Sequence, residues 1–228
     1  MNFLSHFYFD RESDPKTRGY HTLGTVLPDL LKNADKSINI HPEKLSSTDP
    51  LINEIILGWK KHLEVDRYFH SSEYFIVHSS QLRQLLAPAI LGSPVKSFFL
   101  GHITLELILD NLLLTTNKVS ADNFYEHLGF CEQDVIDNFL HFSGLADTSQ
   151  FFRFYESFVR NRYLHTYTDT QQIAYALRRI CMRIWSDPFT TEQEGRMNAI
   201  ISDYRDDLVP GFMSIFDQID DKLNDNKH

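Results

Sequence analysis

The chain of 228 residues has only two cysteines, and they stand in no pattern that binds a metal or forms a redox pair. Cys131 and Cys181 lie far apart and form no Cys-x-x-Cys motif. We expect both to be reduced thiols in or near the core, as is usual in the cytosol. Residues 1–10 are apolar, but they are too short for a signal peptide and lack its basic region. The sequence therefore favours a cytoplasmic protein.

Basic residues are also in short supply. The 22 lysines and arginines are outnumbered by 31 aspartates and glutamates, which gives a formal net charge of −9. A protein that binds nucleic acid or anionic membranes without specificity needs a positive field, so we expect neither partner. Residues 95–114 have the length of a membrane-spanning helix, but they include Lys96, His102, Glu106 and Asp110. These ionisable side chains argue against a span, and we expect a soluble chain.

Signals for β-structure are absent as well. No Asn-Gly or Asp-Gly pair separates alternating apolar runs, and there is no internal repeat. Apolar residues instead recur at helical spacing, and two helix starts combine a capping side chain with a proline, at Asp49-Pro50 and Ser93-Pro94. The predicted fold class is all-α, a single-domain helical bundle that spans residues 1–228.

The rest of the chain predicts one long loop and further helices. Residues 32–49 are polar and aperiodic, and such loops often form lids or binding loops. The Pro210-Gly211 pair should split the last helical region, and residues 224–228 should fray. The further helical regions are predicted from residue 120 onward, at 148–167, at 169–185 and at 191–223.

The stretch from Ser93 to Thr116 contains a conflict. It is apolar on every side of the predicted helix, so it belongs in a core. Yet His102, Glu106 and Asp110 fall at i, i+4 and i+8, which stacks them along one face. Buried ionisable groups cost several kcal/mol each unless they are paired or bound to a metal. A shared metal site would resolve the conflict.

The helix predicted after Asp49 has a second series of this kind, formed by His62, Asp66 and His70. His6 and Asp29 lie in apolar stretches that could pack nearby. Imidazole and carboxylate ligands suit iron, manganese or zinc, and carboxylate-rich sites suit magnesium or manganese. We therefore predict a divalent metal site that draws on both series.

Plainer interpretations of these residues remain open. A polar series at four-residue spacing is often a solvated helix face. Asp29 follows Pro28 and could cap a helix. His6 could be a core histidine whose hydrogen bonds are satisfied.

Several segments together resemble the acyl carrier protein phosphodiesterases, unusual members of the HD-type, all-helical metal-dependent phosphohydrolases. The resemblance covers most of the chain in the same order and implies an HD-domain-like fold. The segments are MNFLSH, LGTVLPDLL, KKHLEVD, ITLELILDNLLL and YLHTYTDTQQIAYALRRICMRIW. Metal-ligand roles carry over to the positions that match the family motifs, which are His6, Asp29, His62, Asp66, Glu106 and Asp110.

The chain also departs from the family pattern. His70 stands where the family commonly has Asp, and Asn111 stands where it has His. Glu106 replaces an Asp, and His78 and His102 are additional imidazoles. Such changes could preserve a metal site with altered ligands or mark a relative with a different metal or substrate.

The resemblance implies hydrolysis of the phosphodiester that joins phosphopantetheine to a serine of acyl carrier protein. The expected ion is Mn²⁺, with Mg²⁺, Fe²⁺ or Zn²⁺ as alternatives, and it would lower the pKa of a bound water and neutralise phosphate charge. We expect catalytic roles for Asp66, His70 and His78, with either histidine as general acid. Lys61 and Arg67 neighbour the ligand series and are candidate phosphate contacts, or else solvated side chains.

An acidic enzyme needs a local basic patch to dock an acidic carrier protein. The substrate-docking candidates are Arg178, Arg179 and Arg183, joined by Arg160 and Arg162. The alternative is that these are exposed helix residues paired with nearby acids.

Two other functions compete with hydrolysis. The spacing His102-x-x-x-Glu106 also fits hemerythrin-like di-iron bundles, so a non-hydrolytic di-metal protein is the main alternative. The third possibility is a helical interaction protein whose buried polar series form only ion pairs and hydrogen bonds.

Overall fold

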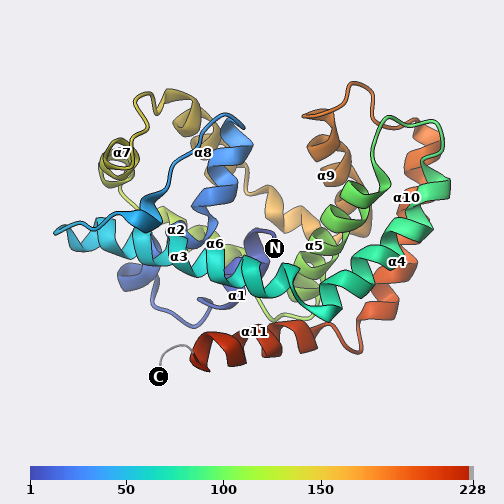
Figure 1. Ribbon diagram of the computed structural model, residues 1–228, viewed down its shortest axis with the longest axis horizontal. Helices are drawn as coiled ribbons and strands as arrows, with labels where there is room; N and C mark the ends of the chain where they lie inside the picture. Colours follow the sequence, from blue (N-terminus) through green and yellow to red (C-terminus); the bar gives the residue numbers. More distant parts are fainter. Residues whose placement is uncertain (226–228) are drawn as a thin grey trace. The chain divides into compact units, whose positions relative to one another are not determined.

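The computed structural model describes residues 1–225, and all regular secondary structure in this range is helical (Figure 1). The predicted all-α class is confirmed. The end of the tail predicted to fray, residues 226–228, lies outside the described range. The elements are α1 (Phe3–Tyr8), α2 (Pro15–Ala34), the 3-10 helix η1 (Pro42–Lys44), α3 (Pro50–His70), α4 (Glu73–Ala89), α5 (Ser97–Thr115), α6 (Ala121–Gly129), α7 (Gln133–Phe142), α8 (Ser149–Asn161), the 3-10 helix η2 (Tyr163–Thr168), α9 (Thr170–Met182), α10 (Thr191–Leu208) and α11 (Met213–Asp225).

These helices form two compact units, each built from separate stretches of the chain. The α2 unit comprises Asn2–Asp66 and Val119–His165. The α5 unit comprises Met1, Arg67–Lys118 and the chain from Thr166 onward. One change of unit falls inside α3, after Asp66. The expectation of a single domain stays a prediction, and the two units are described separately.

In the α2 unit, α2 is the central helix and packs against α1, α6 and α8. Its start has the local signals of a helix N-terminus, because the Asp14 side chain accepts a hydrogen bond from the Lys16 amide at 2.9 Å and Pro15 occupies the first turn. The helix continues to Ala34, so the predicted loop begins three residues later than expected and contains η1.

Two glycines let α2 and α3 approach closely in the α2 unit. A Cβ atom on Gly24 would clash with the carbonyl oxygen of Ile55, and one on Gly58 would clash with the carbonyl oxygen of His21. The backbones of the two helices are therefore in direct contact, which only residues without a side chain allow. This contact brings the middle of α2 next to the turns of α3 that follow Gly58.

In the α5 unit, α5 packs against α4, α9 and α10. It is buried on nearly every side, as its composition predicts, although by length and hydropathy alone it could cross a membrane. Of the 18-residue stretch of α5 with high mean hydropathy, 72% is buried inside the protein, which is typical of the core helix of a soluble protein.

The predicted helix start at Ser93-Pro94 is wrong, whereas the one at Asp49-Pro50 is confirmed. The Asp49 side chain accepts a hydrogen bond from the Leu51 amide at 2.8 Å and caps α3. Ser93 instead donates its hydroxyl proton to the carbonyl of Pro188 at 2.6 Å, and α5 begins only at Ser97. The same hydroxyl accepts a hydrogen bond from the Val95 amide at 3.0 Å, but this local turn does not continue into the helix.

Candidate metal centres

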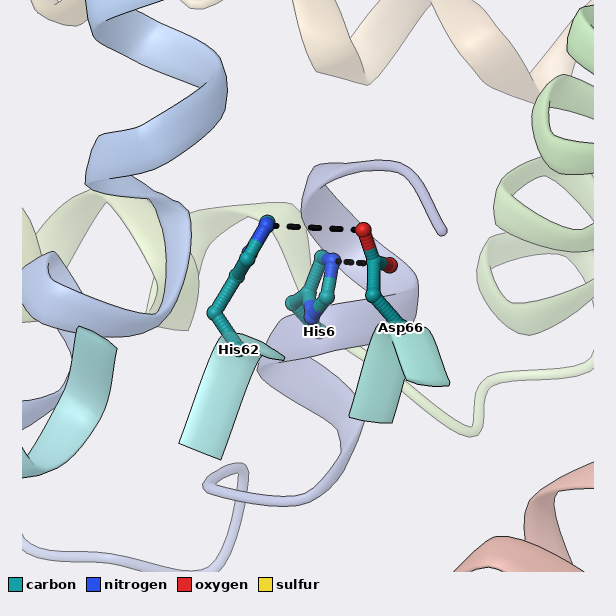
Figure 2. A group of neighbouring side chains, drawn as sticks. All are labelled: His6, His62 and Asp66. Atoms are coloured by element: carbon teal, nitrogen blue, oxygen red, sulfur yellow. Dashed lines mark ion pairs between the residues drawn. The ribbon is translucent and has the colours of Figure 1, made fainter. Parts of the chain in front are cut away.

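The first cluster of metal-ligating side chains lies in the α2 unit. His6 comes from α1, and His62 and Asp66 come from successive turns of α3. Figure 2 shows both imidazoles turned toward the Asp66 carboxylate. His6 Nε2 lies 3.3 Å from Oδ1, His62 Nε2 lies 3.6 Å from Oδ2, and the two rings stack at 4.1 Å. Two imidazoles and one carboxylate are a donor set that holds a divalent transition metal.

The close contact of α2 and α3 orients His62. Its Nδ1 lies 2.9 Å from the carbonyl oxygen of Thr25, so Nδ1 carries the proton and donates it to that oxygen. The other nitrogen, Nε2, then carries the lone pair, and it faces Asp66. A backbone carbonyl that fixes the tautomer in this way is a common outer partner of metal-bound histidine.

His6 is neutral and deeply buried. It is 1% exposed, and burial, followed by the neighbouring His62, lowers its pKa to about 4. Within the described residues neither ring nitrogen makes a well-aligned hydrogen bond, and the nearest carboxylate oxygen is that of Asp66. A buried imidazole without a satisfied nitrogen is costly, and a bound cation would supply the missing partner.

Asp66 provides the negative charge of the cluster. Burial alone would raise the pKa of its carboxyl group, but His6, whose Nε2 lies 3.3 Å from Oδ1, and the adjacent imidazole of His62 contribute to a pKa well below the usual value. The group is therefore ionised at neutral pH, beside neutral His6. This is the protonation state that a metal site requires.

A cavity of about 300 Å³ adjoins the first cluster, because His62 lines it. The lining comes from α2, from α3 and from the loop between them, all within the α2 unit. It is mostly apolar and carries a few polar groups: Asp29, Lys32, Asn39, His41 and Glu43. This combination is typical of small-ligand sites.

The second cluster lies in the α5 unit and is tighter. His70 Nε2 is 3.1 Å from His102 Nε2 and 3.2 Å from Glu106 Oε1. His102 Nε2 is 3.0 Å from the same Glu106 oxygen. The ring of Phe75 packs at 4.9 Å against each imidazole. Three donor atoms thus form a nearly equilateral triangle, again from two histidines and one carboxylate.

Glu106 is ionised, although it is buried. Burial is the largest single effect and would raise the pKa of its carboxyl group, but the amino group of Met1, 3.2 Å from Oε1, opposes burial and lowers the pKa. Hydrogen bonds from His102 and His70 lower it further, to well below its usual value.

The structure divides both predicted ligand series. From α3, His62 and Asp66 belong to the first cluster, and His70 belongs to the second. From α5, His102 and Glu106 form a cluster without Asp110. Residues at i and i+8 are about 12 Å apart along a helix and differ by about 80° in direction, so one ion cannot bind all three members of a series.

Three other predicted site residues lie outside both clusters. Asp29 is inside α2, so it does not cap a helix after Pro28, and it lines the cavity. His78 bonds through Nδ1 to the Tyr204 hydroxyl at 2.8 Å. Asp110 is fully buried on α5, one turn beyond the second cluster. Its neighbour Asn111 has a structural role, since it donates to the carbonyl of Tyr167 at 2.6 Å.

The predicted phosphate contacts have other surroundings. Lys61 donates to Asp10 Oδ1 at 2.6 Å and to the carbonyl of Phe9, so a buried carboxylate already neutralises it. Arg67 is exposed and lies over the ring of Tyr68 at 4.6 Å.

The predicted docking arginines differ in their availability. Arg178 pairs with Glu194 at 3.0 Å, as the alternative interpretation predicted for it. Arg179 and Arg183 are exposed on the same stretch at α9.

Sequence reasoning missed the polar residues of the cavity. Lys32, His41 and Glu43 are separated by irregular chain, so no periodic spacing marks them. The one signal in the sequence is the long polar loop itself, which predicts a binding loop but no particular residues.

Comparison with known proteins adds no further constraint: no family model, no curated protein and no solved structure matches the chain.

Proposed function

We propose that the protein is a metal-dependent phosphodiester hydrolase whose ion is held by His6, His62 and Asp66. The observation that carries this proposal is the position of the first cluster beside a cavity of about 300 Å³. Three protein ligands leave coordination positions open, and an ion in such a site activates water and neutralises phosphate charge. Mn²⁺ is the expected ion, because the resemblance is to metal-dependent phosphohydrolases and imidazole and carboxylate ligands suit manganese.

The cavity supplies a candidate general acid. His41 lines it, and its Nδ1 lies 3.1 Å from Glu43 Oε1, so the carboxylate orients the ring. A histidine held in this way is suited to give a proton to the departing alkoxide of a phosphodiester. In this proposal His41 takes the role that the sequence assigned to His70 or His78.

We further propose that the substrate is the phosphopantetheine arm of acyl carrier protein. The cavity has the size of a site for a small ligand, with apolar walls that include Leu31, Ile38 and Trp59. A slender arm suits such a space, and the carrier protein itself would remain outside. Arg179 and Arg183 are exposed and offer positive charge to an acidic partner.

Intact-mass spectrometry of holo-acyl carrier protein tests the proposal. We expect incubation with the protein and Mn²⁺ to remove the mass of phosphopantetheine, and His62→Ala to abolish the loss. His141→Ala is the matched control, because His141 also pairs with a carboxylate one turn away, Asp137 at 3.5 Å, outside the cluster. An unchanged carrier protein across Mn²⁺, Mg²⁺, Fe²⁺ and Zn²⁺ would remove this substrate.

The second candidate is a non-hydrolytic metal-binding protein. The observation that favours it is the second His-His-Glu cluster, whose ligands include the His102-x-x-x-Glu106 spacing of di-iron bundles. Metal analysis with an optical spectrum separates the two functions. An oxo-bridged di-iron centre absorbs in the visible, whereas a manganese or magnesium hydrolase does not.

A further inference from the structure

We infer that His70, His102 and Glu106 form a six-coordinate Fe²⁺ site of the α5 unit, in which three adjacent positions stay open for exogenous ligands. This site is additional to the hydrolytic function, which uses the first cluster.

The triangle of donor atoms has the size of one face of an octahedron around a metal ion. Its edges are 3.0, 3.1 and 3.2 Å. With metal–ligand bonds of about 2.1 Å, neighbouring ligands are about 3.0 Å apart in an octahedron and about 3.4 Å apart in a tetrahedron. The observed edges match one face of an octahedron. In the first cluster the two imidazoles lie 3.3 and 3.6 Å from different oxygens of Asp66, so its donor atoms do not match the face of an octahedron.

Hydrogen bonds account for only two of the three short distances in the cluster. Glu106 Oε1 can accept a proton from His70 and from His102, which accounts for two edges of the triangle. The third edge brings the two ring nitrogens to 3.1 Å. If one nitrogen donates to the other, the accepting nitrogen has no proton for the carboxylate. Two protons thus account for only two of the three edges, and a cation shared by the three donor atoms would account for all of them.

Aromatic rings hold the two imidazoles of the cluster in place and leave them partly exposed. Phe75 packs against both imidazole rings, and Phe69 packs at 5.1 Å against His70, so the rings are held in place. The side chains of His70 and His102 are 32% and 39% exposed. Solvent and small ligands can therefore reach the two imidazoles, while Glu106 is buried.

The donor set selects the ion. Two imidazoles and one carboxylate on one octahedral face, with the opposite face open, are the arrangement of mononuclear non-haem Fe²⁺ sites. Zn²⁺ prefers four ligands in a tetrahedron, and Mg²⁺ prefers oxygen. The amino group of Met1 now balances the charge of Glu106, and a bound ion would take over that role.

Titration with Co²⁺ tests the site without any assay of activity. Six-coordinate Co²⁺ absorbs weakly in the visible and tetrahedral Co²⁺ absorbs strongly. We expect His102→Ala and His70→Ala each to bind one Co²⁺ fewer per chain than the unaltered protein. The absorption that is lost should have the low intensity of six-coordinate Co²⁺. His78→Ala is the control, because His78 lies on α4 in the same unit and outside the cluster.

Two results would overturn the inference: variants that bind as much Co²⁺ as the unaltered protein, or a lost spectrum of the intense tetrahedral type. Far-ultraviolet circular dichroism of each variant shows whether it is folded, and two independent ligand variants guard against a local packing defect. Anaerobic loading with Fe²⁺ followed by nitric oxide then reports the open positions. The S = 3/2 resonance of an iron–nitrosyl should form with the unaltered protein and not with His102→Ala.

Discussion

At the scale of single residues, the chemistry depends on nitrogens whose protonation the fold controls. His62 shows this most directly, because the carbonyl of Thr25 determines which ring nitrogen faces Asp66. His6 shows it through burial, which keeps the imidazole neutral. The fold therefore keeps His6 neutral and fixes the tautomer of His62, as ligation of a metal would require. Keeping His6 neutral should lower the stability of the folded protein in acid.

We predict that the metal-free protein loses stability between pH 6.5 and 4 because of His6. The folded-state pKa is about 4, below the ordinary 6.5, so in this range the unfolded chain binds a proton that the folded chain does not. The free energy of unfolding should fall with pH, by up to about 3 kcal/mol from this group. Urea unfolding of chelated protein measures it. His6→Gln should have a shallower pH dependence, and equal slopes would contradict the assignment.

We also predict that His41 matters only for poor leaving groups. An alkyl phosphodiester needs a proton on the departing oxygen, whereas a 4-nitrophenolate leaves without one. His41→Gln should therefore lower kcat on an alkyl diester by about 100-fold and leave bis(4-nitrophenyl) phosphate hydrolysis nearly unchanged. His141→Gln serves as the control. Equal losses on both substrates would indicate a structural role for His41 instead.

At the scale of elements, the crossing of α2 and α3 positions the first cluster. Gly24 and Gly58 bring the two backbones together, and His62 bonds to α2 just past this contact. Pro28 lies in the same helix and lacks the amide proton that would otherwise bond to the carbonyl of Gly24. The orientation of His62, a candidate metal ligand, therefore depends on two glycines that lie outside the cluster.

Gly58→Ala should destabilise the protein by about 1–3 kcal/mol, because its Cβ would clash with the carbonyl oxygen of His21. We expect metal affinity at the first cluster to fall as well, since the carbonyl of Thr25 would move away from His62. Denaturant unfolding and isothermal titration calorimetry measure the two effects. Gly129→Ala is the control: nothing lies within 4 Å of the position that its Cβ would take, and it should be neutral or slightly stabilising.

Elements also show what a sequence can predict. The cap at Asp49 is predictable because all its parts are local. The start predicted at Ser93 is wrong, since α5 begins only at Ser97, although the serine hydroxyl accepts from the Val95 amide as well as bonding to Pro188, far along the chain. Pairs such as His102 and Glu106 follow from helical spacing, but the third ligand, His70, comes from another helix. Spacing thus gives two ligands of a site, and only packing gives the third.

At the scale of the whole molecule, bound metal should raise stability by mass action. An ion that binds the folded chain at a concentration about 100 times its Kd adds about 2.7 kcal/mol to the free energy of unfolding. We expect EDTA to lower Tm and Mn²⁺ or Fe²⁺ to restore it. The His62→Ala and His102→Ala variants should each recover less than the unaltered protein. A Tm that changes with neither chelator nor metal would support the alternative in which the two clusters form only ion pairs and hydrogen bonds.

The net charge of −9 makes docking of an acidic partner depend on local positive charge. The double variant Arg179→Glu and Arg183→Glu should raise KM for the carrier protein by about tenfold or more and change kcat little. Arg153→Glu, at an exposed position on α8, is the control for the same kind of charge reversal. An unchanged KM would rule out docking at α9.

Because the two units are interleaved along the chain, the ribosome makes the parts of the α2 unit at different times. His6, His62 and Asp66 have all emerged once residue 66 is made, whereas α6 and α8, which pack on α2, are synthesised only after residue 120. The three ligands of the first cluster thus exist for a time without the helices that complete their unit. An ion captured at that stage would tie α1 to α3 early, and the metal would then act as a folding template as well as a reagent.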